Sequence, residues 1–169
     1  MLEFMKVRNV KSPRRNYGDA GIDIFCPEYS EDLITYIKEK NPKYATDGIM
    51  FDKEGIILPP GANIFIPTGL KYKIPSNVAL IQFPKSGVCL KRQFDCANGV
   101  GDSTYQGELH FHMRNESQTI QKILYGEKIT QFVPVVYDTS EIKVDDYQED
   151  WFTEETFRGS GGFGSTGTK

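Results

Sequence analysis

Alternating apolar and polar positions in the middle of the chain predict a β-rich domain. The clearest run is 108–114, where Leu109, Phe111 and Met113 alternate with charged residues and histidines. A period of two is typical of a strand with one buried face. Runs rich in β-branched and aromatic residues predict further strands at 63–67, 71–74, 78–83 and 129–136. Short strands at this spacing favour an all-β, jelly-roll-like barrel or sandwich.

One segment follows a helical pattern instead. A serine that can cap a helix opens residues 30–40, acids fill the first turn and lysines the last. Three apolar residues share one side at helical spacing: Leu33, Ile34 and Ile37. An asparagine and a proline follow at 41–42 and end the run. We therefore expect one short helix, within an insert at about residues 28–54, packed on the surface of the β domain.

The final stretch, Arg158 to Lys169, has five glycines and Phe163 as its single apolar side chain. It buries too little apolar surface to fold by itself, which predicts a flexible tail. Arginine and hydroxyl groups suit phosphate, and an aromatic ring suits a base. The tail is therefore either a solvated glycine–serine segment or a lid over a ligand. We divide the chain into one β domain at 1–157 and a glycine-rich lid at 158–169.

Composition narrows the class of protein. The chain has 169 residues with 38% hydrophobic and 25% charged residues, which suits one domain with one core. A net charge of −3 gives no basic field for nucleic acid, and no apolar run is long enough to span a membrane. The N-terminus lacks a signal-peptide pattern, and three cysteines without a CxxC motif indicate reduced thiols. We expect a soluble, cytoplasmic protein that binds neither nucleic acid nor membrane.

Four other stretches carry candidate chemistry. They are Asp19–Asp23 (DAGID), Pro84–Gly87 (PKSG), Gly99–Glu108 (GVGDSTYQGE) and Gly126–Gln131 (GEKITQ). The second offers a cation, a hydroxyl and an unobstructed backbone N–H, which together suit a phosphate. Taken alone, each stretch also fits an ordinary turn.

Together with the tail, and in this order, these stretches resemble the five motifs of the trimeric dUTPase family. The tail RGSGGFGSTG and the D-x-x-Y-x-G core of the third motif are the most specific parts. The resemblance runs from about Lys6 to the C-terminus, apart from the insert. It implies jelly-roll subunits in a homotrimer whose active sites are shared between subunits. The implied enzyme is a dUTP diphosphatase that uses Mg²⁺ to hydrolyse dUTP to dUMP and pyrophosphate. This activity limits uracil in DNA and supplies dUMP.

The resemblance also implies roles for individual residues. Asp102 would be the general base that orients and deprotonates a water attacking the α-phosphorus in line. Asp23 would hold Mg²⁺ through water, together with the triphosphate. The implied substrate contacts are Lys85, Ser86, Gly87, Gly99, Tyr105, His110, Gln131, Arg158, Phe163, Ser165 and Thr166.

The implied contacts divide the nucleotide between the motifs. Backbone groups around Gly99 and His110 would read uracil, and the Tyr105 ring would pack under the deoxyribose and exclude a 2′-hydroxyl. The second and fourth motifs would hold the phosphates. Three tail residues would clasp the γ-phosphate: Arg158, Ser165 and Thr166. Phe163 would stack on uracil as the lid closes.

Three positions depart from the family pattern. Lys85 and Lys128 stand where the family usually has arginine, so the charge remains but the bidentate fork is lost. Gly101 replaces a branched apolar residue directly before Asp102. Glycine there removes a side chain that would pack and gives the backbone more freedom.

Two alternative functions and one alternative site stay open. A dCTP deaminase would share the fold, would use a glutamate in the third motif and would not need this tail. A nucleotide-sensing regulatory protein would bind dUTP and, through the insert, a protein partner that the sequence does not identify. His110 and His112 are either metal ligands or, as we prefer, polar residues on the open face of a strand.

Overall fold

The computed structural model of the protein describes residues 1–41, 47–96, 99–144 and 146. The chain divides into two compact units, Met1–Asp138 and Thr139–Lys169. In the second unit the described residues, 139–144 and 146, form neither helix nor strand. The predicted boundary between a domain at 1–157 and a lid at 158–169 stays a prediction, because residues 147–169 lie outside the described part.

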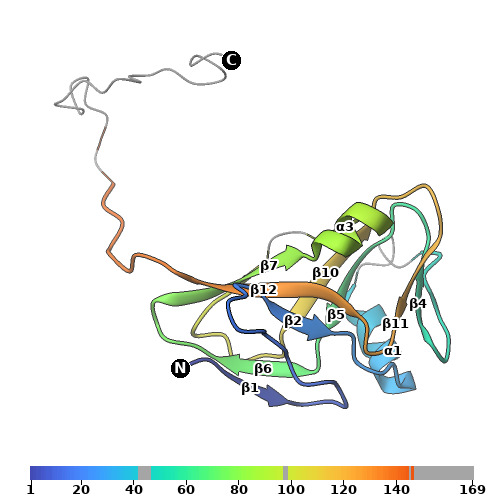
Figure 1. The fold of residues 1–169 in the computed structure, drawn as a ribbon, viewed down its shortest axis with the longest axis horizontal. Helices are drawn as coiled ribbons and strands as arrows, with labels where there is room; N and C mark the ends of the chain where they lie inside the picture. The colour runs from blue at the N-terminus through green and yellow to red at the C-terminus, as the bar shows by residue number, and fades with distance from the viewer. Residues whose placement is uncertain (42–46, 97–98, 145, 147–169) are drawn as a thin grey trace. The chain divides into compact units, whose positions relative to one another are not determined.

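The elements of the first unit are mostly short strands (Figure 1). In chain order they are β1 (Glu3–Lys6), β2 (Ile22–Phe25), α1 (Glu31–Lys40), β3 (Met50–Phe51), β4 (Gly55–Leu58), β5 (Asn63–Pro67), β6 (Leu70–Lys73), β7 (Val78–Pro84), α3 (Ser86–Arg92), β8 (Phe94–Asp95), β9 (Val100–Gly101), β10 (His110–Asn115), β11 (Gln121–Leu124) and β12 (Lys128–Val136). The prediction of an all-β fold with an inserted helix is confirmed.

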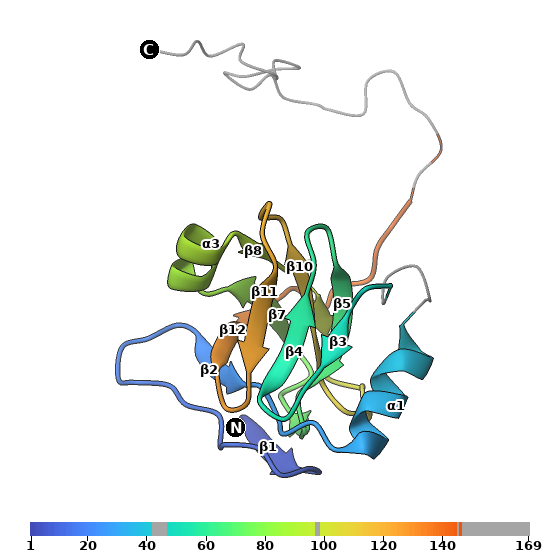
Figure 2. The same ribbon diagram turned by 90° about the vertical axis from the view of Figure 1, so that its right-hand side faces the viewer.

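The strands form small antiparallel sheets around one core (Figure 2). The strand orders are β1-β6, β5-β10-β8, β11-β4-β3 and β2-β12-β7-β9. Within the described residues these sheets do not close into a barrel, so the sandwich alternative describes them better. The core that they enclose includes the fully buried side chains of Phe94, Phe111 and Phe132.

Strand β10 shows how far the alternating pattern determines burial. Phe111 and Met113 are fully buried, whereas Arg114 is exposed. His112 differs from the prediction of an open face, because only 7% of it is exposed. Its ring lies 4.8 Å from that of Phe65, between centroids, and contacts the side chain of Asn63. Neighbouring side chains on β5 therefore cover the face that the sequence left open.

Helix α1 follows the prediction closely. The Ser30 hydroxyl accepts a hydrogen bond from the Leu33 backbone N–H at 3.2 Å and so caps the first turn. Leu33 and Ile37 are buried against the β domain. The helix ends at Asn41, whose side-chain amide bonds both the N–H and the C=O of Phe65 on β5. The insert is therefore tied to the sheet at the end of its helix.

The second helix, α3, was not predicted. It begins at Ser86, within the segment that the sequence analysis treated as a turn, and only Val88 in it is buried. One buried residue in seven gives no amphipathic pattern to detect. The three cysteines, in contrast, are free as predicted, and burial raises the pKa of Cys96 to about 12. None of the described helices has the length and apolar character needed to cross a membrane.

Candidate active site

One sheet collects the four predicted motifs that precede the tail. Its strands lie in the order β2, β12, β7, β9, and Figure 1 shows β2, β12 and β7 running beside one another. Asp23 on β2 is paired with Gln131 on β12. Lys85 follows the last residue of β7, and Asp102 follows the last residue of β9. The register of this sheet therefore determines how far apart the candidate residues lie.

At one end of β7 lies the Asp23 cluster, which comprises Asp23, Lys85, Lys128 and Gln131. One carboxylate oxygen of Asp23 accepts a hydrogen bond from the Lys85 ammonium, and the other lies 3.1 Å from the Lys128 ammonium. The Gln131 amide donates to the Pro84 carbonyl at 3.1 Å. The side chain of Asp23 is 13% exposed, whereas those of the two lysines are 27% and 41% exposed.

The charges of this cluster act on Asp23. Partial burial alone would raise the pKa of the Asp23 carboxyl, but hydrogen bonds and charge from Lys85 and Lys128 outweigh it. The pKa therefore lies below its ordinary value, and Asp23 is ionised at neutral pH. The cluster joins one carboxylate to two lysine ammonium groups, either of which can pair instead with a bound anion.

The second motif lies next to this cluster and is open to solvent. Ser86 and Gly87 form the first turn of α3, and both are exposed. A Cβ added at Gly87 would meet no atom within 4 Å. The backbone here is thus accessible to a ligand, as the predicted phosphate contact requires.

A pocket of about 210 Å³ lies around β9, and Gln82 is its lining residue from β7. It contains the three residues expected around the base and sugar, Gly99, Tyr105 and His110, together with Asp102, the expected general base. The lining residues are Phe65, Tyr72, Gln82, Gly99, Val100, Gly101, Asp102, Tyr105, Leu109, His110 and Phe132. A larger hollow of about 560 Å³ lies between Tyr105 and β1, but Asp102, Gly99 and His110 do not line it. The smaller pocket is therefore the better candidate for the nucleoside.

Tyr105 is held inside the third motif by two features. Its hydroxyl donates a hydrogen bond to the Glu108 carbonyl at 3.0 Å. A Cβ on Gly107 would overlap that hydroxyl, so only glycine leaves room for it. The D-x-x-Y-x-G pattern thus has a local physical cause. His110 approaches the same carbonyl through Nδ1, at 2.8 Å.

Tyr72 is a pocket residue that the sequence analysis missed. Its hydroxyl donates to the backbone carbonyl of Asp102 at 2.9 Å, and burial together with the nearby charges of Asp102 and Tyr105 raises its pKa to about 12. A Cβ on Gly101 would lie 2.7 Å from the same hydroxyl. The Tyr72 hydroxyl therefore occupies the space that a branched side chain at Gly101 would fill. The departure at Gly101 could have signalled such a partner.

The pocket and the Asp23 cluster lie at separate places on the sheet. Strand β9 pairs with β7 at Leu80 and Gly101, one residue before Asp102. Asp23 lies level with Phe83 of β7, through its partner on β12. The two acids are therefore offset by three strand spacings and about four residues, roughly 20 Å at ordinary sheet dimensions. A single chain does not bring Asp102 to Asp23.

Comparisons with known proteins decide the family. A family model described as dUTPase matches residues 32–167. A deoxyuridine 5′-triphosphate nucleotidohydrolase of Pseudomonas fluorescens is 40% identical over 139 residues, which cover 75% of this chain and 87% of that protein. This chain belongs to the dUTPase family. The protein of the same name from Gloeothece citriformis is 36% identical over 116 residues, covering 68% of this chain and 77% of the relative. The predicted enzyme class is therefore confirmed.

A solved dUTPase supports the fold. The dUTPase of Staphylococcus bacteriophage 80alpha, determined with dUpNHpp, has a TM-score of 0.74 and 24% sequence identity to this chain. The similarity covers 99% of this chain and 98% of that one. At this identity the likeness shows the fold, and it agrees with the predicted jelly-roll arrangement.

Membership in the dUTPase family also bears on the deaminase alternative. That alternative needs a glutamate in the third motif, where the chain has Glu108. The Glu108 carboxylate instead accepts hydrogen bonds from the Arg8 guanidinium at 3.0 Å and from the Gly69 N–H at 2.8 Å. Its side chain is only 11% exposed. Glu108 is thus a structural group here.

The predicted tail contacts lie outside the described residues. They are Arg158, Phe163, Ser165 and Thr166. The other predicted contacts fall into two groups: Lys85, Ser86, Gly87 and Gln131 at the end of β7 and the start of α3, and Gly99, Tyr105 and His110 in the pocket around β9. The structure thus gathers each motif's residues as expected but separates the phosphate group from the nucleoside group.

Proposed function

We propose that this chain hydrolyses dUTP to dUMP and pyrophosphate, and so limits uracil in DNA and supplies dUMP. The observation that carries the proposal is the pocket of the third motif. It places Asp102 beside Tyr105 and Gly99, in a chain of the dUTPase family. The nucleotide analogue bound to the related phage dUTPase supports the choice of dUTP.

In this proposal the pocket selects the base and the sugar. The Tyr105 ring packs under the deoxyribose and leaves no room for a 2′-hydroxyl. Backbone groups near Gly99 and His110 accept and donate to uracil. A methyl group in an apolar pocket changes binding by only about 1–3 kcal/mol. Exclusion of thymine therefore needs a backbone wall that clashes with its 5-methyl group.

Asp102 carries the proton transfer. Its carboxylate accepts a proton from a water molecule, whose oxygen attacks the α-phosphorus while the bond to the bridging oxygen breaks and pyrophosphate leaves. The proton then passes from Asp102 to solvent. The Tyr72 hydroxyl donates a hydrogen bond to the backbone carbonyl of Asp102, and this contact fixes the backbone position from which the Asp102 side chain extends. Orientation of this kind removes much of the entropic cost of the reaction.

Asp23 fits the role of the acid that binds Mg²⁺ through water. It is ionised, half-buried and already faces two cationic groups, Lys85 and Lys128. Magnesium usually keeps several waters and binds through one or two carboxylates plus substrate phosphates. When bound, the ion neutralises charge on the triphosphate. Lys85 and Lys128, released from Asp23, would then hold phosphate oxygens as point charges.

The proposed active site is completed by assembly. Asp102 of one subunit would face the Asp23 cluster of another, because about 20 Å separates the two groups within a chain. A homotrimer with shared sites satisfies this requirement. The tail at 158–169 would close over the nucleotide, with Arg158, Ser165 and Thr166 on the γ-phosphate and Phe163 on uracil. A regulatory protein partner for the insert stays a prediction.

A substrate panel tests the activity. Pyrophosphate and ammonia release are measured with Mg²⁺ and dUTP, dCTP, dTTP or UTP in turn. We expect pyrophosphate from dUTP alone at a high rate, with no ammonia. Turnover of dCTP with ammonia release would instead establish a deaminase. Failure to turn over dUTP, although dUpNHpp binds, would favour the nucleotide-sensing alternative.

A further inference from the structure

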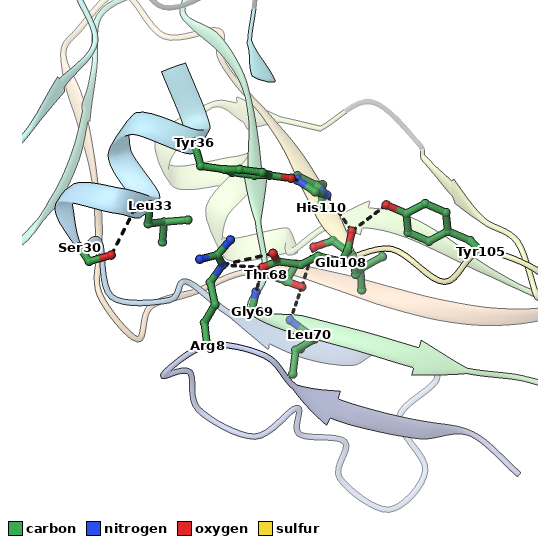
Figure 3. A network of polar contacts seen from close by, with 11 residues as sticks. Arg8, Ser30, Leu33, Tyr36, Thr68, Gly69, Leu70, Tyr105, Glu108 and His110 are labelled. Atoms are coloured by element: carbon green, nitrogen blue, oxygen red, sulfur yellow. Dashed lines mark hydrogen bonds and ion pairs between the residues drawn. The ribbon is translucent and has the colours of Figure 1, made fainter. Parts of the chain in front are cut away.

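The inserted helix is joined to the nucleoside pocket by a closed ring of four residues (Figure 3). The ring consists of Tyr36 on α1, His110 and Glu108 in the third-motif region, and Arg8 after β1. The Tyr36 hydroxyl lies 3.2 Å from His110 Nε2, and His110 Nδ1 lies 2.8 Å from the Glu108 carbonyl. The Glu108 carboxylate pairs with Arg8 at 3.0 Å. The Arg8 guanidinium lies 5.4 Å from the centre of the Tyr36 ring and closes the circuit.

This ring of four residues determines which nitrogen of the His110 imidazole carries the proton. A backbone carbonyl only accepts hydrogen bonds, so Nδ1 must donate to Glu108. In a neutral imidazole the other nitrogen is then an acceptor, and the Tyr36 hydroxyl can donate to it. The Tyr36 and His110 rings are also stacked, with centroids 6.0 Å apart and an angle of 29° between planes. The Glu108 carbonyl therefore fixes the tautomer of His110, and Tyr36 fixes the orientation of its ring.

The helix that carries Tyr36 is itself fixed at both ends. Before it, the Tyr29 carbonyl accepts a hydrogen bond from the Tyr125 hydroxyl at 2.7 Å. After it, the Asn41 amide bonds the backbone of Phe65 at 2.7 and 2.9 Å. Both Asn41 and Tyr29 are buried. The insert thus presents Tyr36 from a rigid base rather than from a free loop.

Glu108 connects this ring to Tyr105. The Glu108 carbonyl accepts two hydrogen bonds, one from His110 Nδ1 and one from the Tyr105 hydroxyl. Loss of the Tyr36 hydroxyl would leave His110 Nε2 without its donor, and the imidazole could then turn out of line with the Glu108 carbonyl. The carbonyl would be held less firmly, and the acceptor of Tyr105 would move with it.

We infer that Tyr36 is a positioning residue for nucleotide selection: through His110 and the Glu108 carbonyl, the inserted helix holds Tyr105 where it excludes a ribose. The inference rests on the proposed function, because Tyr105 must contact the sugar for its position to matter. It gives the insert a role inside the enzyme. Tyr36 itself does not line the nucleoside pocket, so it acts only through His110.

The test is the ratio of kcat/KM for dUTP to that for UTP in Tyr36→Phe. Phenylalanine keeps the ring stacked and removes only the hydroxyl. We expect the ratio to fall about fivefold, as the loss of one hydrogen bond implies. The fall should come from better use of UTP and a higher KM for dUTP, with kcat for dUTP unchanged. Tyr125→Phe is the matched control, since it removes a hydroxyl that ties the other end of the insert. It should keep the wild-type ratio.

A double-mutant cycle separates positioning from general loosening. If Tyr36 acts through Tyr105, the combined variant Tyr36→Phe, Tyr105→Phe should have nearly the ratio of Tyr105→Phe alone. Independent effects would instead multiply. Nitrogen NMR of the histidine rings adds a direct readout: wild-type His110 should be protonated at Nδ1, and loss of the Tyr36 hydrogen bond in Tyr36→Phe should shift the Nε2 resonance of His110, which Tyr125→Phe should leave unchanged.

Two results overturn the inference. Either Tyr36→Phe matches Tyr125→Phe in its dUTP to UTP ratio, or the Nε2 resonance of His110 is the same in both variants. Failure of the proposed function is distinct from these outcomes, because the wild-type protein would then not hydrolyse dUTP, whether or not it binds dUpNHpp.

Discussion

The two outer strands of the four-stranded sheet, β9 and β2, carry sites that are built in different ways. Beside β9, two tyrosine hydroxyls bond backbone carbonyls around the nucleoside pocket: Tyr72 bonds that of Asp102, and Tyr105 bonds that of Glu108. Beside β2, the Asp23 cluster is held by ion pairs with two lysines, Lys85 and Lys128. Hydrogen bonds to fixed backbone groups keep one geometry, whereas flexible ammonium groups exchange partners readily.

This difference assigns selection and binding strength to separate regions. A preorganised pocket distinguishes substrates by shape, because a misfit cannot be relieved by small movements. Lysine ammonium groups act as point charges, so we expect the cluster to bind any triphosphate with similar strength. Substitutions in the pocket should therefore change which nucleotide is used, and substitutions in the cluster should weaken all nucleotides alike.

The largest expected effect comes from the pocket's acid. Asp102→Asn removes the group that accepts the proton and should lower kcat for dUTP about 1,000-fold, within the range of general-base catalysis. Binding of dUpNHpp, measured by calorimetry, should stay within about twofold because asparagine is nearly isosteric. Asp32→Asn, an exposed carboxylate on α1, is the control and should have wild-type activity. A near-normal rate for Asp102→Asn would remove it as the base.

Substitutions in the Asp23 cluster should weaken the binding of all nucleotides alike. Lys85→Met keeps the stem of the side chain and removes its charge, so affinity for dUTP, UTP and dCTP should each fall about tenfold, the loss of one charge-assisted contact. Lys91→Met, on the exposed side of α3, should leave all three unchanged. Competition against dUpNHpp measures each affinity. A loss confined to dUTP would contradict the division between the two regions.

Tyr72 should act on the rate with a smaller effect. Tyr72→Phe removes the hydrogen bond to the Asp102 carbonyl and should lower kcat about fivefold, with little change in dUpNHpp affinity. The neighbouring glycine offers a second readout. Gly101→Ala should destabilise the wild-type protein more than it destabilises the Tyr72→Phe variant, because a Cβ at this position lies 2.7 Å from the Tyr72 hydroxyl. If Gly101→Ala shifts the urea midpoint equally in the wild-type and Tyr72→Phe backgrounds, contact with the Tyr72 hydroxyl does not limit the side chain at position 101.

The smallest effect concerns pH. The pKa of Asp23 is lowered in the folded state, so its ionised form stabilises the protein above the unfolded value of about 4. That stability is lost as the pH falls through the folded pKa. The difference in urea midpoint between wild type and Asp23→Asn should be largest at neutral pH and should shrink below about pH 4. A difference independent of pH would show that charge is not its source.

Local patterns were the part of the fold that the sequence could predict. The cap at Ser30, the buried Leu33 and Ile37, and the alternation of β10 involve neighbours within a few residues, so they can be detected by spacing alone. Helix α3 could not be predicted, because one buried residue gives no periodic pattern. The burial of His112 was also missed, since it depends on Phe65 from another strand.

The site followed the same division. Resemblance to a family assigned candidate roles to Asp23, Asp102 and Tyr105, because their motifs are short and continuous. It could not locate Tyr72, whose partner at Gly101 lies far along the chain and is a residue without a side chain. Nor could it show that the acids lie roughly 20 Å apart, because that distance follows from the register of β7 with two other strands.

The most direct test of the account is complementation between two inactive variants. Asp102→Asn and Asp23→Ala subunits are mixed, either by co-expression or by refolding together, and pyrophosphate release from dUTP is measured. If each site takes Asp102 from one subunit and Asp23 from another, random mixing should restore about a quarter of wild-type activity, since one site in four pairs two intact groups. If the mixture is no more active than the separate variants, each site lies within one chain and the account is contradicted.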